Sequence, residues 1–150
     1  MRIALYQPDI PQNSGNIFRL GACFGISIDI IEPTGYIFDD KRFRRSSMDY
    51  INHIDYKRHV DWENFINWSK KSNFRLILLT TKAEKKYCDY TYKDNDILLF
   101  GRESAGVPKK VHNNVDEQIT IPMVKGLRSI NVSSAVALVV GEACRQLNLF

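Results

Sequence analysis

The chain has 150 residues, of which 44% are hydrophobic and 25% are charged, and its formal net charge is +4. This length fits a single domain over residues 1–150, and the composition excludes an intrinsically disordered chain. The mildly basic charge is compatible with a polyanionic partner without establishing one. The cysteines have no C-x-x-C spacing, which argues against a zinc or dithiol site, and no apolar run has the ~18–20 residues of a membrane helix. We therefore expect a cytoplasmic protein with no membrane segment and no metal.

Short apolar runs alternate with amphipathic segments along the first half of the chain. The apolar positions 17, 20, 21 and 24 share one helical face, and Gly25 is a candidate for the C-terminal cap of that helix. The predicted elements are strands over 3–6 and 27–31, a short strand within 53–59, and helices over 16–24, 39–45 and 61–71.

The second half continues the alternation with three strands and a long helix. The runs 75–80, 97–100 and 118–121 are continuously apolar or nearly so, as in strands that are covered on both faces. From Val132 to Leu147 the apolar residues recur at the spacing of one helical face. Strands that alternate with helices predict an α/β fold with a mostly parallel sheet flanked by helices.

The first of three polar segments is residues 13–19, with the sequence Asn-Ser-Gly-Asn-Ile-Phe-Arg. It follows the first predicted strand, where open α/β sheets bind their ligands. Asn13 or Ser14 is also a candidate helix cap, and Arg19 lies off the apolar stripe of the helix. The segment contains neither the G-x-G-x-x-G fingerprint of dinucleotide sites nor the Walker phosphate loop.

The other two segments lie in the second half of the chain. Residues 98–108 end a buried strand in a turn with two glycines, where Glu103 either caps a helix or holds a partner. Residues 121–134 lead into the last helix, where Ser129 and Asn131 are candidates for N-capping and for ligand binding. Capping and ligand binding are compatible, because a helix N-terminus offers unpaired N–H groups.

Together, in this order and at these separations, the three segments resemble the three motifs of the SPOUT superfamily of RNA methyltransferases. The N-x-G-N-I-x-R start, the F-G-x-E-x-x-G turn and the I-P-M…R-S-x-N-x-S end are similar to the SpoU branch, which methylates ribose 2′-oxygens. The resemblance covers nearly the whole chain. Within this branch the chain looks like the minimal members that methylate the wobble nucleotide of tRNA, a cytidine or modified uridine at position 34, in leucine isoacceptors.

The resemblance implies S-adenosylmethionine as cofactor, tRNA as substrate, and a homodimer whose active sites lie at the subunit interface. It also implies a deep trefoil knot in the C-terminal half. The positions that it assigns to the cofactor are Leu79, Thr80, Gly101, Ile121, Met123 and Ser129. It places Arg19 at the ribose, supported by Asn13, Glu103, Ser129 and Asn131. The basic residues that it assigns to the tRNA surface are Lys41, Arg42, Arg44 and Arg45.

A guanidinium group stays protonated in proteins, which makes Arg19 a poor general base. We therefore expect Arg19 to position the ribose and to stabilise negative charge that develops on its 2′-oxygen. Two alternatives remain at this point. One is a non-catalytic RNA-binding module on the same fold, and the other is a nucleotide-binding oxidoreductase, which the missing glycine fingerprint disfavours.

Overall fold

The computed structural model describes residues 1–38, 45, 48–127 and 129–149. Within them six strands form one sheet in the order β3-β2-β1-β5-β4-β6, and every neighbouring pair is parallel. The strands are β1 Arg2–Tyr6, β2 Ser27–Ile31, β3 Tyr56–His59, β4 Arg75–Leu79, β5 Asp96–Phe100 and β6 Glu117–Ile119. The helices are α1 Pro11–Phe24, the 3₁₀ helix η1 Met48–His53, α3 Trp62–Lys71, α4 Lys109–His112 and α5 Val132–Leu147. The predicted α/β fold with a parallel sheet is confirmed, and the trefoil knot stays a prediction.

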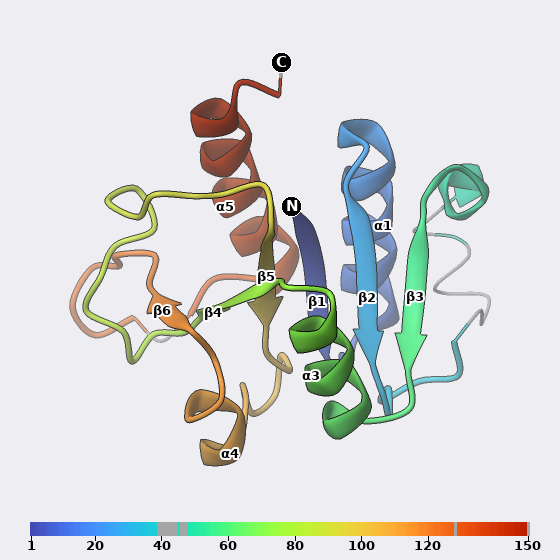
Figure 1. Ribbon diagram of the computed structural model, residues 1–150, viewed down its shortest axis with the longest axis horizontal. Helices are drawn as coiled ribbons and strands as arrows, with labels where there is room; N and C mark the ends of the chain where they lie inside the picture. Colours follow the sequence, from blue (N-terminus) through green and yellow to red (C-terminus); the bar gives the residue numbers. More distant parts are fainter. Residues whose placement is uncertain (39–44, 46–47, 128, 150) are drawn as a thin grey trace.

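Helices cover both faces of the sheet, with α1 and α5 on one face and α3 and α4 on the other (Figure 1). Alternate strand residues therefore pack in opposite directions. Ile3 and Leu5 of β1 join the core beneath α1 and α5, whereas Ala4 joins the core beneath α3. The central strands are buried on both sides, because Leu98 and Leu99 of β5 are both fully inaccessible. Their continuous apolar sequence is what such burial requires.

The N-terminus of α1 differs from the prediction, because the helix begins at Pro11 rather than at residue 16. Proline suits the first helical position, since its missing N–H would have no partner there. Asn13 therefore does not cap α1: the cap position is Ile10, with no side-chain hydrogen bond, and Asn13 is buried inside the first turn. At the other end Gly25 adopts φ 65° and closes the helix as predicted.

Other boundaries follow the sequence closely, with small departures. Strand β6 ends at Ile119, two residues before its predicted end, although Thr120 still forms an isolated parallel bridge with Lys86. Phe24, which was assigned to the buried face of α1, is 39% exposed. The helix predicted over 39–45 lies outside the described residues except for position 45.

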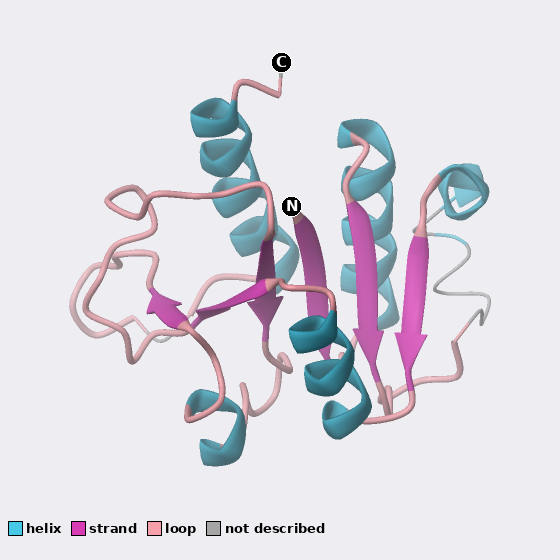
Figure 2. Cartoon of the chain, viewed as in Figure 1, coloured by secondary structure: helices cyan, strands magenta, loops and turns pink. Residues whose placement is uncertain are grey.

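Two long connections of the fold lie at the β6 side of the sheet. Figure 2 shows the loops that join β4 to β5 and β6 to α5 beside the β6 edge. Because parallel strands end at the same edge of a sheet, the loops after β4, β5 and β6 begin close to one another. The predicted second and third polar segments are therefore brought together here.

A buried ionic cluster fixes the opposite part of the sheet. The Asp29 carboxylate, fully inaccessible on β2, accepts hydrogen bonds from Arg2 Nε at 2.7 Å and pairs with His59 Nε2 at 2.8 Å. Replacing Asp29 by alanine is expected to lower the free energy of unfolding by about 3–5 kcal/mol, because it leaves buried polar partners uncompensated. Urea unfolding measures this loss. The matched control is Asp55→Ala, which removes an exposed partner 3.4 Å from Arg2 Nη1 and should cost at most about 1 kcal/mol.

Candidate active site

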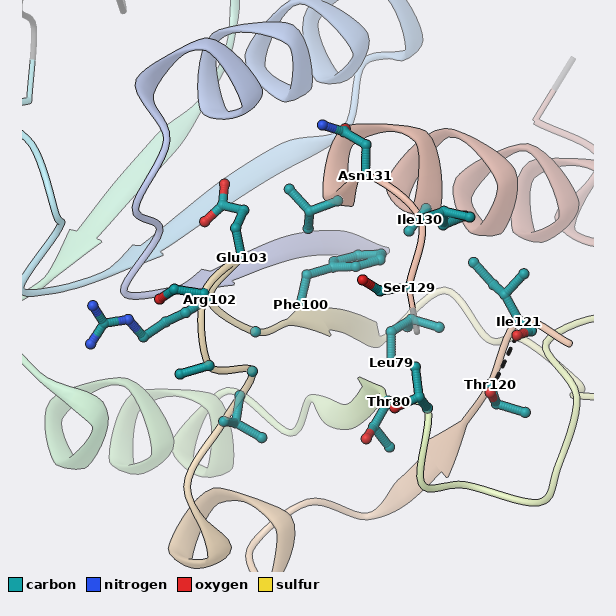
Figure 3. Close-up of a pocket in the computed structure, with 18 of the residues that line it drawn as sticks. Leu79, Thr80, Phe100, Arg102, Glu103, Thr120, Ile121, Ser129, Ile130 and Asn131 are labelled. Atoms are coloured by element: carbon teal, nitrogen blue, oxygen red, sulfur yellow. Dashed lines mark hydrogen bonds between the residues drawn. The ribbon is translucent and has the colours of Figure 1, made fainter. Parts of the chain in front are cut away.

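A pocket of about 570 Å³ opens where β4, β5 and β6 end and α5 begins. A volume of this size suits a small-molecule ligand or cofactor. Figure 3 shows Leu79, Thr80, Phe100, Ile121 and Ser129 around this space. Its wall comes from the start of α1, the segments that follow β4, β5 and β6, α4, and the segment that leads into α5. The lining residues that matter below are Ile10, Asn13, Leu79, Thr80, Gly101, Arg102, Glu103, Ser104, His112, Ile121, Met123, Ser129, Ile130 and Asn131.

The turn after β5, residues 101–106, forms one wall of the pocket and is closed on itself. Arg102 N donates to Gly106 O at 3.0 Å, and Gly106 N donates to Arg102 O at 2.8 Å. Gly101 packs so tightly on this bridge that an added Cβ would lie 2.7 Å from the carbonyl carbon of Gly106. Position 101 therefore accommodates glycine alone, and the backbone itself forms this wall of the pocket.

A chain of side-chain hydrogen bonds connects the three polar segments. Asn13 Nδ2 donates to Glu103 Oε1 at 3.1 Å, and Asn131 Nδ2 donates to Asn13 Oδ1 at 2.9 Å. The Oδ1 atom of Asn131 accepts from Ser133 N at 2.8 Å and from Ser134 N at 3.4 Å, so Asn131 also caps α5. Residues that are 90 and 118 positions apart in sequence therefore form one rigid unit at the pocket.

Most of the predicted site residues meet at this pocket. Those that line it are Asn13, Leu79, Thr80, Gly101, Glu103, Ile121, Met123, Ser129 and Asn131. Of the two predicted cap candidates before α5, Asn131 is the cap. Their roles toward cofactor and ribose remain predictions, although their convergence follows directly from the fold.

Arg19 is the exception among the predicted catalytic residues. It is not one of the described residues that line the pocket. Its side chain is exposed on α1, with the guanidinium carbon 5.5 Å from the ring centroid of Tyr50. Of the predicted RNA-binding residues, Lys41, Arg42 and Arg44 lie outside the described residues, and Arg45 is exposed. One copy of the chain therefore does not bring Arg19 to its own pocket.

The sequence analysis missed the residues that hold the 101–106 turn from outside. Asp9 accepts hydrogen bonds from Arg102 Nη2 at 2.7 Å and from Ser104 N at 3.2 Å. The bond from Arg102, helped by those from Ser104, holds the pKa of the Asp9 carboxyl below its ordinary value. Its position could have identified it, because Asp9 is an acidic residue in the turn between β1 and α1, at the carboxyl end of the strands where ligands bind.

His112 also lines the pocket and was not predicted as a site residue. It ends α4, and its Nδ1 lies 3.0 Å from Gln118 Oε1. Gln118 Nε2 in turn donates to the carbonyl oxygen of His112 at 3.1 Å, which fixes α4 against β6.

Within the described part of the chain, no three His, Cys, Asp or Glu side chains are grouped closely enough to hold a metal ion. No helix among the same residues is long and apolar enough to cross a membrane.

Comparison with known proteins decides the family. Residues 1–141 match the SpoU rRNA methylase family. The chain belongs to this family. Among SpoU relatives, the tRNA (cytidine(34)-2'-O)-methyltransferase of Beijerinckia indica is 50% identical over 145 residues, which cover 97% of this chain and 91% of that protein. The protein of the same name from Escherichia coli K12 is 43% identical, covering 98% of this chain and 94% of its own length.

Solved SpoU structures have the same fold. One, described as giving structural insights into the 2-OH methylation of C/U34 on tRNA, superposes with a TM-score of 0.93 at 33% identity, covering 98% of this chain and 95% of that one. The AdoMet-bound rRNA methyltransferase from Sinorhizobium meliloti has a TM-score of 0.89 at 26% identity, covering 97% of this chain and 56% of that one. The predicted membership of the SpoU branch is confirmed.

Proposed function

We propose that this protein transfers a methyl group from S-adenosylmethionine to the ribose 2′-oxygen of nucleotide 34, the wobble cytidine or a modified uridine, in tRNA. The observation that carries the proposal is the convergence of Asn13, Glu103 and Asn131, from three distant segments, on one pocket. The similarity over almost the full length to relatives named for cytidine 34 supports this position in tRNA. We extend the proposal to leucine isoacceptors as substrates and to the cytoplasm as the compartment.

The pocket fits the cofactor in size and in character. Apolar side chains such as Leu79, Ile121 and Met123 line it beside the tightly packed Gly101 turn. An adenosine group would suit such a site, because the apolar walls would cover its ring. The residues that would hold it are Leu79, Thr80, Gly101, Ile121, Met123 and Ser129. When bound, S-adenosylmethionine supplies an electrophilic methyl group on a sulfonium.

The protein's own contribution is orientation and electrostatics. The bonds from Asn13 to Glu103 and from Asn131 to Asn13 fix these polar groups before any substrate arrives. Orienting two bound reactants contributes ~7–11 kcal/mol to lowering a barrier, more than a general base supplies. Arg19 then holds the ribose and stabilises charge on the attacking oxygen, while the proton leaves to water or to a phosphate.

A homodimer accounts for the position of Arg19. Its side chain is exposed on α1 and lies outside the pocket of its own chain, so a second copy would supply it. Two apolar residues that line the pocket, Ile10 and Ile130, are 41% and 39% exposed in the single chain, and a second copy would cover them. Isolated large apolar residues are common on surfaces, so these two residues support the proposed interface only together with the position of Arg19.

Binding of tRNA is assigned to the basic run that contains Lys41, Arg42, Arg44 and Arg45. Pooling the basic residues of two copies increases the attraction of a protein whose net charge is only +4 per chain. Affinity that depends on phosphate contacts should fall steeply with salt concentration. A non-catalytic RNA-binding module is the less favoured alternative, because it gives no reason for the intact polar network at the pocket.

Transfer of labelled methyl groups tests the proposal. The purified protein is incubated with labelled S-adenosylmethionine and tRNA from cells that lack wobble ribose methylation, and the labelled nucleosides are identified. We expect the label in 2′-O-methylcytidine and in a 2′-O-methyluridine derivative. Absence of label together with intact cofactor binding would indicate another RNA substrate, and absence of both would favour the non-catalytic module.

A further inference from the structure

We propose that Asp9 is a positioning residue that sets the conformation of the 101–106 turn and, through it, the cofactor site. This inference deepens the proposed function, on which its catalytic consequence rests. Asp9 itself lies outside the three motif segments.

Asp9 holds three consecutive residues of the turn. Its carboxylate accepts from Arg102 through Nε at 3.1 Å and Nη2 at 2.7 Å, and from both the backbone N–H and the hydroxyl of Ser104. Its backbone N–H donates to Glu103 Oε2 at 2.8 Å. Both guanidinium nitrogens donate to Oδ1, whereas Ser104 donates to Oδ2, so each carboxylate oxygen holds a different residue of the turn. Asp9 therefore orients three consecutive residues of the turn, Arg102, Glu103 and Ser104.

These bonds give the Arg102 and Glu103 side chains different partners, the Asp9 carboxylate for Arg102 and the Asp9 backbone N–H for Glu103. Figure 3 shows the Arg102 side chain extending away from Phe100 and Ser129, whereas Glu103 projects in another direction. Glu103 reaches the Asn13 side chain at 3.1 Å, so it belongs to the network of the active site. Arg102 and Glu103 are adjacent and of opposite charge, and the Asp9 carboxylate gives the guanidinium a partner other than Glu103.

Asp9 is itself held in place from behind. Gly35 N donates to Pro8 O at 2.9 Å, and a Cβ added at Gly35 would lie 2.9 Å from the Asp9 Cα atom. The carboxylate is only 17% exposed, in contrast to the 38% of Arg102. Asp9 is therefore a partly buried residue with a tightly packed backbone, and its contact with Arg102 differs from an ion pair between two exposed side chains.

The test is a double-mutant cycle that reads cofactor affinity and catalysis separately. Asp9→Asn keeps the backbone bond to Glu103 but removes the charge that binds Arg102 and Ser104. We expect the Kd for S-adenosylmethionine, measured by calorimetry, to rise about tenfold, and kcat with tRNA to fall about 10–100-fold. Arg102→Gln should act in the same direction, and the double variant should be no worse than the more damaged single variant. Asp9→Glu, which retains the carboxylate, should recover part of the loss.

The control is Glu32→Gln, which removes a comparable contact to Arg58 at 2.6 Å away from the pocket and should leave cofactor affinity unchanged. Wild-type affinity in Asp9→Asn, or losses that multiply in the double variant, would overturn the proposal. If Asp9→Asn does not fold, Arg102→Lys replaces it, because a single ammonium cannot donate to Asp9 Oδ1 from two nitrogen atoms. The calorimetric arm needs no tRNA, so failure of the wild type to methylate tRNA leaves this result interpretable.

Discussion

Replacing Arg19 by lysine is expected to reduce kcat about 10²–10³-fold at every pH, the size of effect seen when one charge-stabilising donor is removed. The planar guanidinium orients a ribose and an oxyanion together, and an ammonium on a flexible stem does not. A general base would behave differently, because lysine loses a proton far more readily than arginine and would recover activity as the pH rises. The measurement is the pH profile of single-turnover methyl transfer. Recovery at alkaline pH would refute the positional role.

Mixing two inactive variants tests whether Arg19 acts in the pocket of a second copy. Arg19→Ala and Glu103→Gln are each expected to be inactive, since they remove different parts of the same site. After unfolding and refolding together, mixed dimers would hold one intact site each, and about a quarter of the wild-type activity should return for random pairing in a two-fold dimer. No recovery beyond the sum of the two variants would place Arg19 and Glu103 of the same chain at one site.

Replacing Gly101 by alanine is expected to raise the Kd for S-adenosylmethionine about tenfold to a hundredfold. The added Cβ would lie 2.7 Å from the carbonyl carbon and 2.9 Å from the Cα atom of Gly106, both backbone atoms that cannot turn aside. The turn must therefore open, and the wall of the pocket moves with it. Calorimetric titration of the cofactor measures the change.

The matched control for this substitution is Gly141→Ala on α5, where an added Cβ meets no heavy atom within 4 Å. Alanine is the better helix former by about 0.8–1.0 kcal/mol, so this variant should be at least as stable as the wild type and bind the cofactor equally well. Unchanged affinity in Gly101→Ala would show that the pocket beside Gly106 is not the cofactor site.

The sequence predicted the layers of this fold because its strands and helices differ clearly in periodicity. A short, continuous apolar run such as 97–100 predicts a strand covered on both faces. The amphipathic pattern of α5 predicts a helix with one face on the core. The predicted start of α1 was wrong because residues 11–15 are mostly polar and show no apolar periodicity. The helix nevertheless begins at Pro11, which suits the first helical position, and the Asn13 side chain in this first turn bonds to Glu103 and Asn131 in other loops.

The motifs predicted which residues gather at the pocket, but not how they are held. Asn13 interacts with Glu103 and Asn131 across most of the chain, and a sequence of one chain records no such pairing. Asp9 was missed for the same reason, since its partners Arg102 and Ser104 are 93 and 95 residues away. The place of Arg19 off the apolar stripe agrees with its exposure, but the sequence does not say that the side chain lies outside the pocket of its own chain.

The most direct test of the central claim is to locate the methyl group within the substrate RNA. A tRNA with cytidine at position 34 is incubated with the protein and S-adenosylmethionine, end-labelled, and partially cleaved with alkali. Cleavage after a nucleotide needs its free 2′-hydroxyl, so a 2′-O-methyl group leaves one gap in the ladder. The account predicts a single gap at nucleotide 34, absent without cofactor. A gap at another position, or incorporated methyl with an unbroken ladder, would contradict it.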